Sequence, residues 1–334
     1  MFDVITIGSA TIDLFLSSEA EVITVKTHFH EQEMIAYPAG KKILVEHISH
    51  MTGGGATNTA VAFARLGLKT GCICKVGTDG YGDQIIQELK TEKIAFLGVQ
   101  AKEETGCSVV LDSVKHDRTI LVCKGVNNHL QMKEIKKNKL ATKWFYVSAL
   151  LGDSYKTCEE LALFAEKNNI QIAFNPSNYL AEKGKAALHV LLSRTNVLLL
   201  NKEEAQALVH MPIDEPKNEI KNLLKECRRI IHADGMVVIT DGKNGAYCYD
   251  GKMQYFIQPR QIQVIETTGA GDAFTSTFLA AYIKTKNIKS SLRLAQINAE
   301  SVIQAFGAKN ILLSWKEAMK QMTNYKHQIK TVKL

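Results

Sequence analysis

Apolar runs typical of buried strands recur along the chain, at residues 2–8, 71–76, 144–150, 171–174, 197–200 and 236–240. Apolar positions at helical spacing lie between and after them, at residues 60–66, 155–168, 219–232, 270–284 and 291–306. Strand and helix patterns that alternate in this way are typical of βαβ units, whose strands form a parallel sheet. The pattern therefore predicts an α/β fold with a mostly parallel central sheet.

Two stretches interrupt this alternation. Residues 14–50 hold no convincing helix but carry β-type runs at 22–25 and 43–48, and residues 107–123 hold two β runs around a polar turn. We expect antiparallel strands outside the main sheet, paired into one small β lobe. Such a lobe, inserted after the first strand, would serve as a lid over a site at the strand ends.

These patterns predict how the chain divides between two parts. The core would comprise residues 1–13, 51–104 and 124–324, and the β lid residues 14–50 and 105–123. The polar, basic tail from 324 to 334 is expected to fray.

Composition and charge narrow the class of protein. The 334 residues are 46% hydrophobic and 22% charged, which is ordinary for a globular enzyme and excludes disordered and fibrous classes. The net charge of +7 comes from lysines spread along the chain, so we expect no nucleic-acid partner. No apolar run approaches the roughly 18 residues of a membrane span, and residues 2–8 do not resemble a signal peptide. We therefore expect no membrane association and a cytoplasmic location.

The most informative segment, Glu-Thr-Thr-Gly-Ala-Gly-Asp-Ala-Phe, begins at Glu266 after a β-like run at 261–265 and opens an apolar helix. Glycines let the backbone approach a ligand closely, and the unpaired N–H groups of a helix start bind anions. Asp272 would repel a bound phosphate, but it suits a general base beside a transferring phosphoryl group. Taken alone, a helix cap in a glycine turn is an equal alternative. The order of residues, the Thr-Thr pair and the apolar helix together favour the functional interpretation.

A second glycine-rich turn, Gly53-Gly54-Gly55-Ala56-Thr57-Asn58, precedes a helix that extends to Gly67. The amide of Asn58 offers donors and an acceptor, which suits recognition of a polyol. A glycine triplet is equally typical of a flexible turn, so this segment gains its meaning from the first one.

The two segments together resemble the signatures of the PfkB family of ribokinase-like carbohydrate and nucleoside kinases. The first signature is matched by Gly53, Gly54, Asn58, Gly67 and Gly77, and the second by residues 267–272. The resemblance extends from residue 2 to about residue 320. It implies a ribokinase-like, three-layer α/β/α fold with a mostly parallel central sheet and a small β-sheet lid.

The resemblance also implies an activity, ATP-dependent phosphoryl transfer to a primary hydroxyl of a small sugar. Asp272 would be the general base, and an anion hole would be formed by the amides of Gly269, Ala270, Gly271 and Asp272. The residues implied for acceptor binding are Asp13, Gly53, Gly54 and Asn58. Those implied for ATP binding are Asn201, Glu204, Thr240, Gly242, Gly245 and Asn298.

Two cations follow from the same resemblance. Glu204 lies one helical turn from Asn201, so the two could organise a hydrated Mg²⁺. Without the other motifs, Glu204 would be interpreted as part of a solvated helix face. In relatives, an acidic residue at the position of Glu266 helps bind a monovalent cation, so K⁺ is the second expected ion. Glu266 departs from the Asp common there by one extra methylene.

Several alternatives stay open at this point. An adenosine-like nucleoside fits as well as a sugar, and a sugar-phosphate kinase or a non-catalytic binding protein is a further alternative. His116 and Arg118 on the turn of the predicted lid could contact the acceptor, although a solvated hairpin tip is the favoured interpretation. The unpaired edges of a small β lobe predict a homodimer formed through the lid.

Other phosphate-binding motifs are absent from the sequence. There is no GxxxxGK[ST] run, so a P-loop is excluded. The first βα turn, from Gly8 to Asp13, is not G-x-G-x-x-G, and no His-Arg-Asp loop of protein kinases occurs.

Overall fold

The computed structural model describes residues 1–17, 21–26, 31–45, 47–112, 118–211, 219–325 and 328–334. Within this part of the chain, the largest sheet has the strand order β18-β17-β16-β15-β14-β13-β12-β1-β6-β8. Its strands are β1 (Phe2–Ile7), β6 (Thr70–Ile73), β8 (Ala95–Phe96), β12 (Thr142–Ser148), β13 (Gln171–Asn175), β14 (Val197–Asn201), β15 (Met236–Thr240), β16 (Ala246–Tyr249), β17 (Met253–Ile257) and β18 (Lys330–Lys333). The strands from β15 to β8 are parallel, and β16 to β18 extend the sheet in antiparallel pairing.

Helices cover both faces of this sheet. They are α1 (Gly55–Arg65), α2 (Gly80–Thr91), α3 (Asp153–Lys167), α4 (Ser177–Ala181), α5 (Gly184–Ala187), α6 (His189–Leu192), α7 (Lys202–Val209), α8 (Glu219–Arg229), α9 (Ala270–Thr285), α10 (Ile288–Val302) and α11 (Trp315–Thr323). Alternate residues of each strand face opposite sides of a sheet. On β12, Phe145 therefore packs with α3, α7 and α8, while Tyr146 packs with α1, α9 and α10. The result is the predicted three-layer α/β/α fold.

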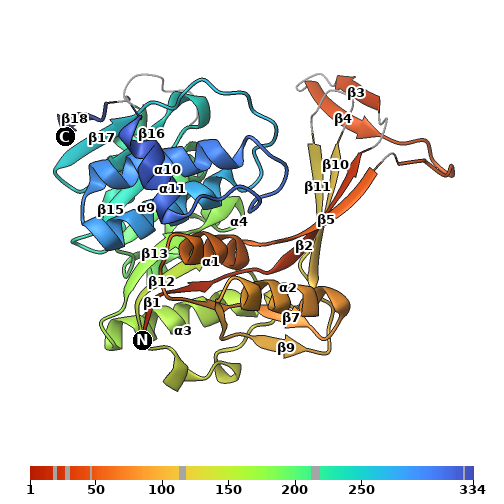
Figure 1. Cartoon of the computed structure of the whole chain (residues 1–334), viewed down its shortest axis with the longest axis horizontal. Coiled ribbons are helices and arrows are strands. Elements are labelled where there is room, and N and C mark those ends of the chain that lie inside the picture. The colour runs from red at the N-terminus through yellow and green to blue at the C-terminus, as the bar shows by residue number, and fades with distance from the viewer. Residues whose placement is uncertain (18–20, 27–30, 46, 113–117, 212–218, 326–327) are drawn as a thin grey trace.

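A second, smaller sheet projects from this core (Figure 1). Its order is β11-β10-β2-β5, from β2 (Thr11–Ser17), β5 (His47–Gly53), β10 (Gly106–Asp112) and β11 (Arg118–Cys123). The two stretches that interrupt the βα alternation thus do pair with each other. Two further pairs are the hairpin of β3 (Glu21–Lys26) with β4 (Glu31–Ala36) and the parallel pair of β7 (Lys75–Gly77) with β9 (Val99–Ala101).

The detail of the small sheet differs from the prediction. β10 pairs with β2 in parallel, not antiparallel, because both strands leave the core in the same direction. The predicted boundaries at residues 13 and 51 fall inside β2 and β5, so Asp13 lies on the small sheet. The run at 43–48 is not the strand: Leu44 is 93% exposed, and the strand begins at His47. His116 lies outside the described residues, and Arg118 begins β11.

Three other predictions about local structure were wrong. The helix expected from residue 60 begins at Gly55, directly after the glycine pair. Residues 261–264 form no strand, because Val264 is exposed and the segment crosses the protein surface. The tail that was expected to fray includes β18, which pairs with β17.

Among the described residues, no helix is both long and apolar enough to cross a bilayer.

Candidate active site

The two glycine-rich turns lie next to each other at the starts of α1 and α9, and these two helices pack together. Gly54 precedes α1 with φ of 96°, and Gly269 precedes α9 with φ of 80°. A Cβ on Gly54 would lie 2.5 Å from the Ser9 carbonyl oxygen, and one on Gly269 would lie 2.4 Å from the Ala308 Cβ. Both positions therefore require glycine for two reasons, backbone conformation and close packing.

A hydrogen bond joins the two turns. Asn58 Nδ2 donates to Asp272 Oδ2 over 2.9 Å, between residues of α1 and α9 that are 214 positions apart. Asn58 is buried, and its Oδ1 has no hydrogen-bond partner among the described residues. An unpaired buried amide oxygen costs free energy, so a donor from a ligand is the natural partner.

The carboxyl group of Asp272 has a higher pKa than an ordinary aspartate. Burial raises its pKa to about 6, and the nearby charge of Asp13 acts in the same direction. The hydrogen bond from Asn58 and the positive charge of Lys309 oppose this rise. Asp272 is therefore mostly ionised at neutral pH, but it binds a proton more readily than an ordinary aspartate.

Asp13 lies on β2, packed tightly against Gly53 of β5. Thr11 Oγ1 donates to Asp13 Oδ1 over 3.1 Å, and Thr11 faces Gly53 in the strand register. A Cβ on Gly53 would lie 2.0 Å from Asp13 Oδ2, so only glycine leaves room for this carboxylate. Burial raises the pKa of Asp13, whereas the hydroxyl groups of Ser108 and Thr11 lower it.

The carboxyl ends of four neighbouring parallel strands form one edge of the main sheet. Ser148 ends β12, Asn175 ends β13, Asn201 ends β14 and Thr240 ends β15. Ser148 and Asn175 line one cavity, while Asn201 and Thr240 line another. This edge is where ligands bind in open α/β sheets.

The cavity beside Asp272 has a volume of about 220 Å³ and a wall of mixed polar and apolar side chains. It is lined by Ser9, Gly55, Lys124, Asn127, Asn128, Ser148, Ala149, Leu150, Leu151, Asn175, Ser177, Tyr179 and Asp272. Ser148 Oγ and Asn128 Oδ1 are buried and lack a hydrogen-bond partner among the described residues. These two atoms are available to a hydroxylated molecule in the cavity. Asn58 contacts Asp272 but does not line this cavity, and neither do Asp13, Gly53 and Gly54, the other residues predicted to bind the acceptor.

The larger cavity, of about 1050 Å³, lies on the other side of the α9 turn. Of the residues predicted to bind the nucleotide, it is lined by Asn201, Thr240, Gly242 and Gly245. Ala270 and Gly271 also line it, whereas Asp272 lines the smaller cavity. The first turn of α9 is thus a wall shared by the two cavities.

Asn201 and Glu204 form two reciprocal hydrogen bonds at the start of α7. Asn201 Oδ1 accepts from Glu204 N over 2.7 Å, and Glu204 Oε2 accepts from Asn201 N over 2.8 Å. Burial raises the pKa of Glu204, and the negative charge of Asp272 raises it further. In the described part of the chain, no group of three or more His, Cys, Asp or Glu side chains could hold a metal ion. A hydrated Mg²⁺ on a single carboxylate fits this geometry better than a protein-enclosed site.

Two predicted residues occupy buried positions away from the cavity walls. Asn298 is fully buried: its Nδ2 donates to Thr277 Oγ1 over 2.7 Å, and its Oδ1 accepts from Leu313 N over 2.9 Å. The structure thus gives it a role in packing α10 and does not bring it to the larger cavity. Glu266 is buried behind the α9 turn, where its Oε2 accepts from Gly307 N over 2.8 Å.

Sequence reasoning missed most residues of the smaller cavity. Asn127, Ser148, Asn175 and Tyr179 belong to no short motif. The available signal was their position, since Ser148 and Asn175 end the parallel strands β12 and β13 and lie within two residues of the ends predicted for these strands.

Comparisons with known proteins agree with this geometry. A family model described as pfkB family carbohydrate kinase matches residues 1–315. A ribokinase of Lactococcus lactis is 27% identical over 278 residues, which cover 81% of this chain and 85% of that protein. A cytidine kinase of Thermococcus kodakarensis is 27% identical over 320 residues, which cover 92% of this chain and 98% of that protein. The solved structure of an Arabidopsis thaliana ribokinase with ribose and ATP superposes with a TM-score of 0.81 at 20% identity. The superposition covers 96% of this chain and 98% of that one.

The raised pKa of Asp272 predicts that its charge destabilises the folded protein. The folded state binds this proton up to a pH of about 6, whereas the unfolded chain releases it near 3.9, so stability falls as pH rises between these values. Asp272→Asn should therefore increase the free energy of unfolding at pH 8 by on the order of 2 kcal/mol, and by less at pH 4.5. Denaturant titrations at the two pH values measure this.

The matched control is Asp234→Asn, at an exposed aspartate. It should change stability by less than about 0.5 kcal/mol at either pH. An Asp272→Asn protein no more stable than wild type at pH 8 would contradict the burial argument.

Proposed function

Because the chain belongs to the pfkB family of carbohydrate kinases, we propose that it transfers the γ-phosphoryl group of ATP to a primary hydroxyl of a small sugar. One observation carries this proposal: Asp272 lies at a wall shared by a nucleotide-sized cavity and a smaller cavity. A molecule in each cavity would bring the acceptor hydroxyl and the γ-phosphate to opposite sides of the same helix turn.

The proposed chemistry uses the start of α9. The acceptor hydroxyl gives its proton to the Asp272 carboxylate as its oxygen bonds to the γ-phosphorus, and the bond from that phosphorus to the bridging oxygen of ADP breaks. Gly271 and Asp272 contribute N–H groups that a helix start cannot pair within itself, and these stabilise the charge on the transferring group. The N–H of Ala270, also expected in the anion hole, instead donates to the Thr267 carbonyl oxygen over 3.2 Å. Asn58 holds the carboxylate in position through its 2.9 Å hydrogen bond. A pKa of about 6 suits this role, because the base is ionised at pH 7 yet accepts a proton readily.

In this proposal, the larger cavity binds ATP along Asn201, Thr240, Gly242 and Gly245. Mg²⁺, when bound with the nucleotide, neutralises phosphate charge, and Glu204 would hold it through water. Glu266 would be the acidic residue nearest a monovalent cation such as K⁺, and its bond to Gly307 N fixes its position behind the anion-binding turn.

The acceptor would occupy the smaller cavity, between Asp272 and the small sheet. Asp13, backed by Gly53 and Gly54, would bind acceptor hydroxyls, and the unused oxygen of Asn58 would accept from another. The small sheet would then act as the lid that excludes water, which otherwise competes as phosphoryl acceptor.

A nucleoside is the second candidate acceptor, and the apolar side of the smaller cavity, with one tyrosine, favours it. Tyr179, Leu150 and Leu151 line the cavity and could pack against a base. One of the relatives is named a cytidine kinase. Lys124 lies 4.4 Å from the centre of the Tyr179 ring and lines the same cavity, which keeps a sugar phosphate as a third candidate.

A screen of ATP consumption across sugars, nucleosides and sugar phosphates tests the activity and separates these acceptors. Tyr179→Ala should lower kcat/KM by about tenfold or more for a nucleoside, because stacking on an aromatic ring contributes about 1–3 kcal/mol per base. It should change kcat/KM for a free sugar far less. Tyr81→Ala, at an exposed tyrosine on α2, is the matched control. ATP binding without phosphorylation of any acceptor would favour a non-catalytic binding protein.

Asp272→Asn should lower kcat by about a hundredfold or more, since general-base contributions run at about 10²–10⁴. ATP affinity should change little, because Asp272 lines the smaller cavity. Steady-state kinetics and calorimetric titration with ATP measure the two quantities. Near-normal turnover would remove Asp272 from the role of base.

Asp13→Ala should raise the acceptor KM by about tenfold or more, because hydrogen bonds to a charged group contribute about 1.5–3 kcal/mol. Asp13→Asn keeps part of the hydrogen bonding and should have a smaller effect. Unchanged acceptor KM in both variants would refute the assignment.

We also propose that two copies associate through their small sheets. Strand register places Val110, Ile120 and Val122 on the same face of the sheet as Asp13, and Ile120 and Val122 are 47% and 38% exposed. Val122→Glu should convert a dimer to a monomer in sedimentation experiments, whereas Leu163→Glu, at an exposed position of α3, should not. A monomeric wild-type protein at micromolar concentration would contradict this association.

A further inference from the structure

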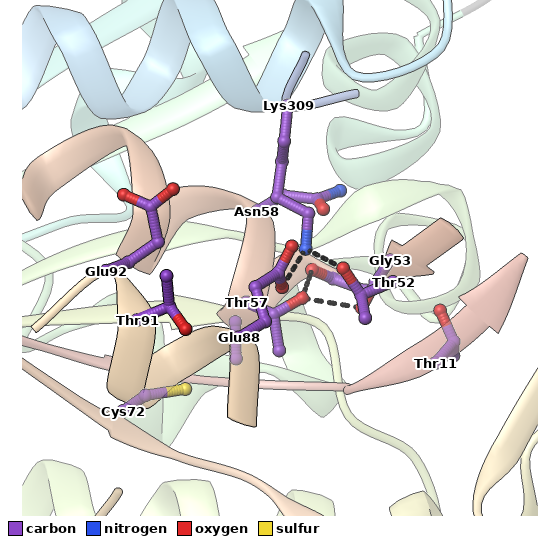
Figure 2. Close-up of polar contacts among 12 residues, drawn as sticks. Thr11, Thr52, Gly53, Thr57, Asn58, Cys72, Glu88, Thr91, Glu92 and Lys309 are labelled. Carbon is purple, nitrogen blue, oxygen red and sulfur yellow. Dashed lines mark hydrogen bonds and ion pairs between the residues drawn. The ribbon is translucent and has the colours of Figure 1, made fainter. Parts of the chain in front are cut away.

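A buried lysine lies beneath the proposed acceptor site. Lys309, in the segment after α10, is only 7% exposed, and its Nζ donates to Thr52 Oγ1 and to Glu88 Oε2, each over 2.6 Å (Figure 2). These partners lie on β5 and α2, 257 and 221 positions away in the sequence. Burying an ammonium is costly unless it is paired, so this arrangement needs an explanation.

The backbone around Lys309 contacts the anion-binding turn. Gly307 N donates to Glu266 Oε2, and Ala308 packs so closely on Gly269 that a Cβ there would lie 2.4 Å away. Arg65 of α1 donates to the Lys309 carbonyl oxygen over 2.7 Å. Residues 307–309 therefore contact the α9 turn through their backbone and the acceptor strand β5 through the lysine side chain.

Lys309 bonds to β5 directly beside the residue that packs on Asp13. Thr52 directly precedes Gly53, the residue packed against the Asp13 carboxylate. The charged and titratable groups around the ammonium are Glu88 of α2, Asp13 of β2, Cys72 of β6 and Asp272 of α9. The positive charge of Lys309 lowers the pKa of both Asp13 and Asp272.

We propose that Lys309 is a positioning residue that fixes the acceptor-binding strand relative to the α9 turn and supplies a positive charge near Asp13 and Asp272. The inference rests on the proposed function for its catalytic consequence, but its structural and electrostatic parts do not. It assigns the Lys309–Glu88 pair to the site although neither residue lines the smaller cavity.

The first test needs no acceptor. The pH above which the stability gain from Asp272→Asn stops increasing reports the pKa of Asp272 in the folded protein, and it is measured by denaturant titration in the wild-type background and in three variant backgrounds. In a Lys309→Met background this pH should rise by about half a unit or more, because a nearby positive charge is lost. In a Glu88→Gln background it should fall, because a negative charge is lost. Lys90→Met, which removes an exposed lysine from the same helix α2, should leave it unchanged.

The second test uses ATP with ribose or cytidine, whichever the wild-type protein phosphorylates. Lys309→Met should raise the acceptor KM by about tenfold or more, since small displacements of binding groups have large effects. The KM for ATP should change by less than about twofold, because Lys309 does not line the larger cavity. Lys309→Arg should restore much of the acceptor KM and the pH behaviour.

Opposite pH shifts in Lys309→Met and Glu88→Gln would distinguish an electrostatic role from general destabilisation, which would move both in one direction. Identical pH behaviour in all backgrounds, or equal changes in both KM values, would overturn the proposal. Where Lys309→Met does not fold, Glu88→Gln and Lys309→Arg still decide it. A wild-type protein that phosphorylates nothing would refute the kinase proposal but leave the first test in force.

Discussion

The structure depends on holding one carboxylate where two helix starts meet. Asp272 at the beginning of α9 and Asn58 in α1 share a hydrogen bond of 2.9 Å, and both helices begin directly after a glycine with positive φ. Neither glycine can change, because each is in contact with a neighbouring backbone or Cβ. The parallel sheet brings its carboxyl ends to the same edge, so the two cavities necessarily lie on either side of this carboxylate.

The sequence predicted the parts of this arrangement that repeat or that follow a fixed order. Buried parallel strands are apolar on both faces, so β12 to β15 were recognisable, and the glycine-led turns were recognisable by residue order. Antiparallel strands such as β18 carry polar residues and depend on a partner strand that no local pattern reveals. The Lys309–Glu88 pair spans 221 positions, and the burial of Asn298 depends on Leu313 and Thr277, so both were outside the reach of sequence reasoning.

The site is built from groups that do not favour folding. Asp272 is less stable ionised in the fold than in water, Asn58 and Ser148 have buried polar atoms without partners among the described residues, and Lys309 is buried as an ammonium. Each costs free energy that the apolar packing on both faces of the sheet must offset. Violations of this kind are expected at a functional site, because a ligand can satisfy what the protein leaves unpaired.

Charge balance explains why a lysine would be buried here at all. The charge of Asp13 already raises the pKa of Asp272, and in the proposed mechanism ATP brings further negative charge to the shared wall. A cation that arrives with the nucleotide cannot offset the repulsion between the carboxylates of Asp13 and Asp272 before ATP binds. A lysine held by Glu88 and Thr52 can, since its charge belongs to the protein before any ligand binds, and it lies outside both cavities and so displaces neither acceptor nor nucleotide. Its pairing with Glu88 reduces its effect on Asp272, so the base keeps a pKa high enough to accept the proton of a hydroxyl.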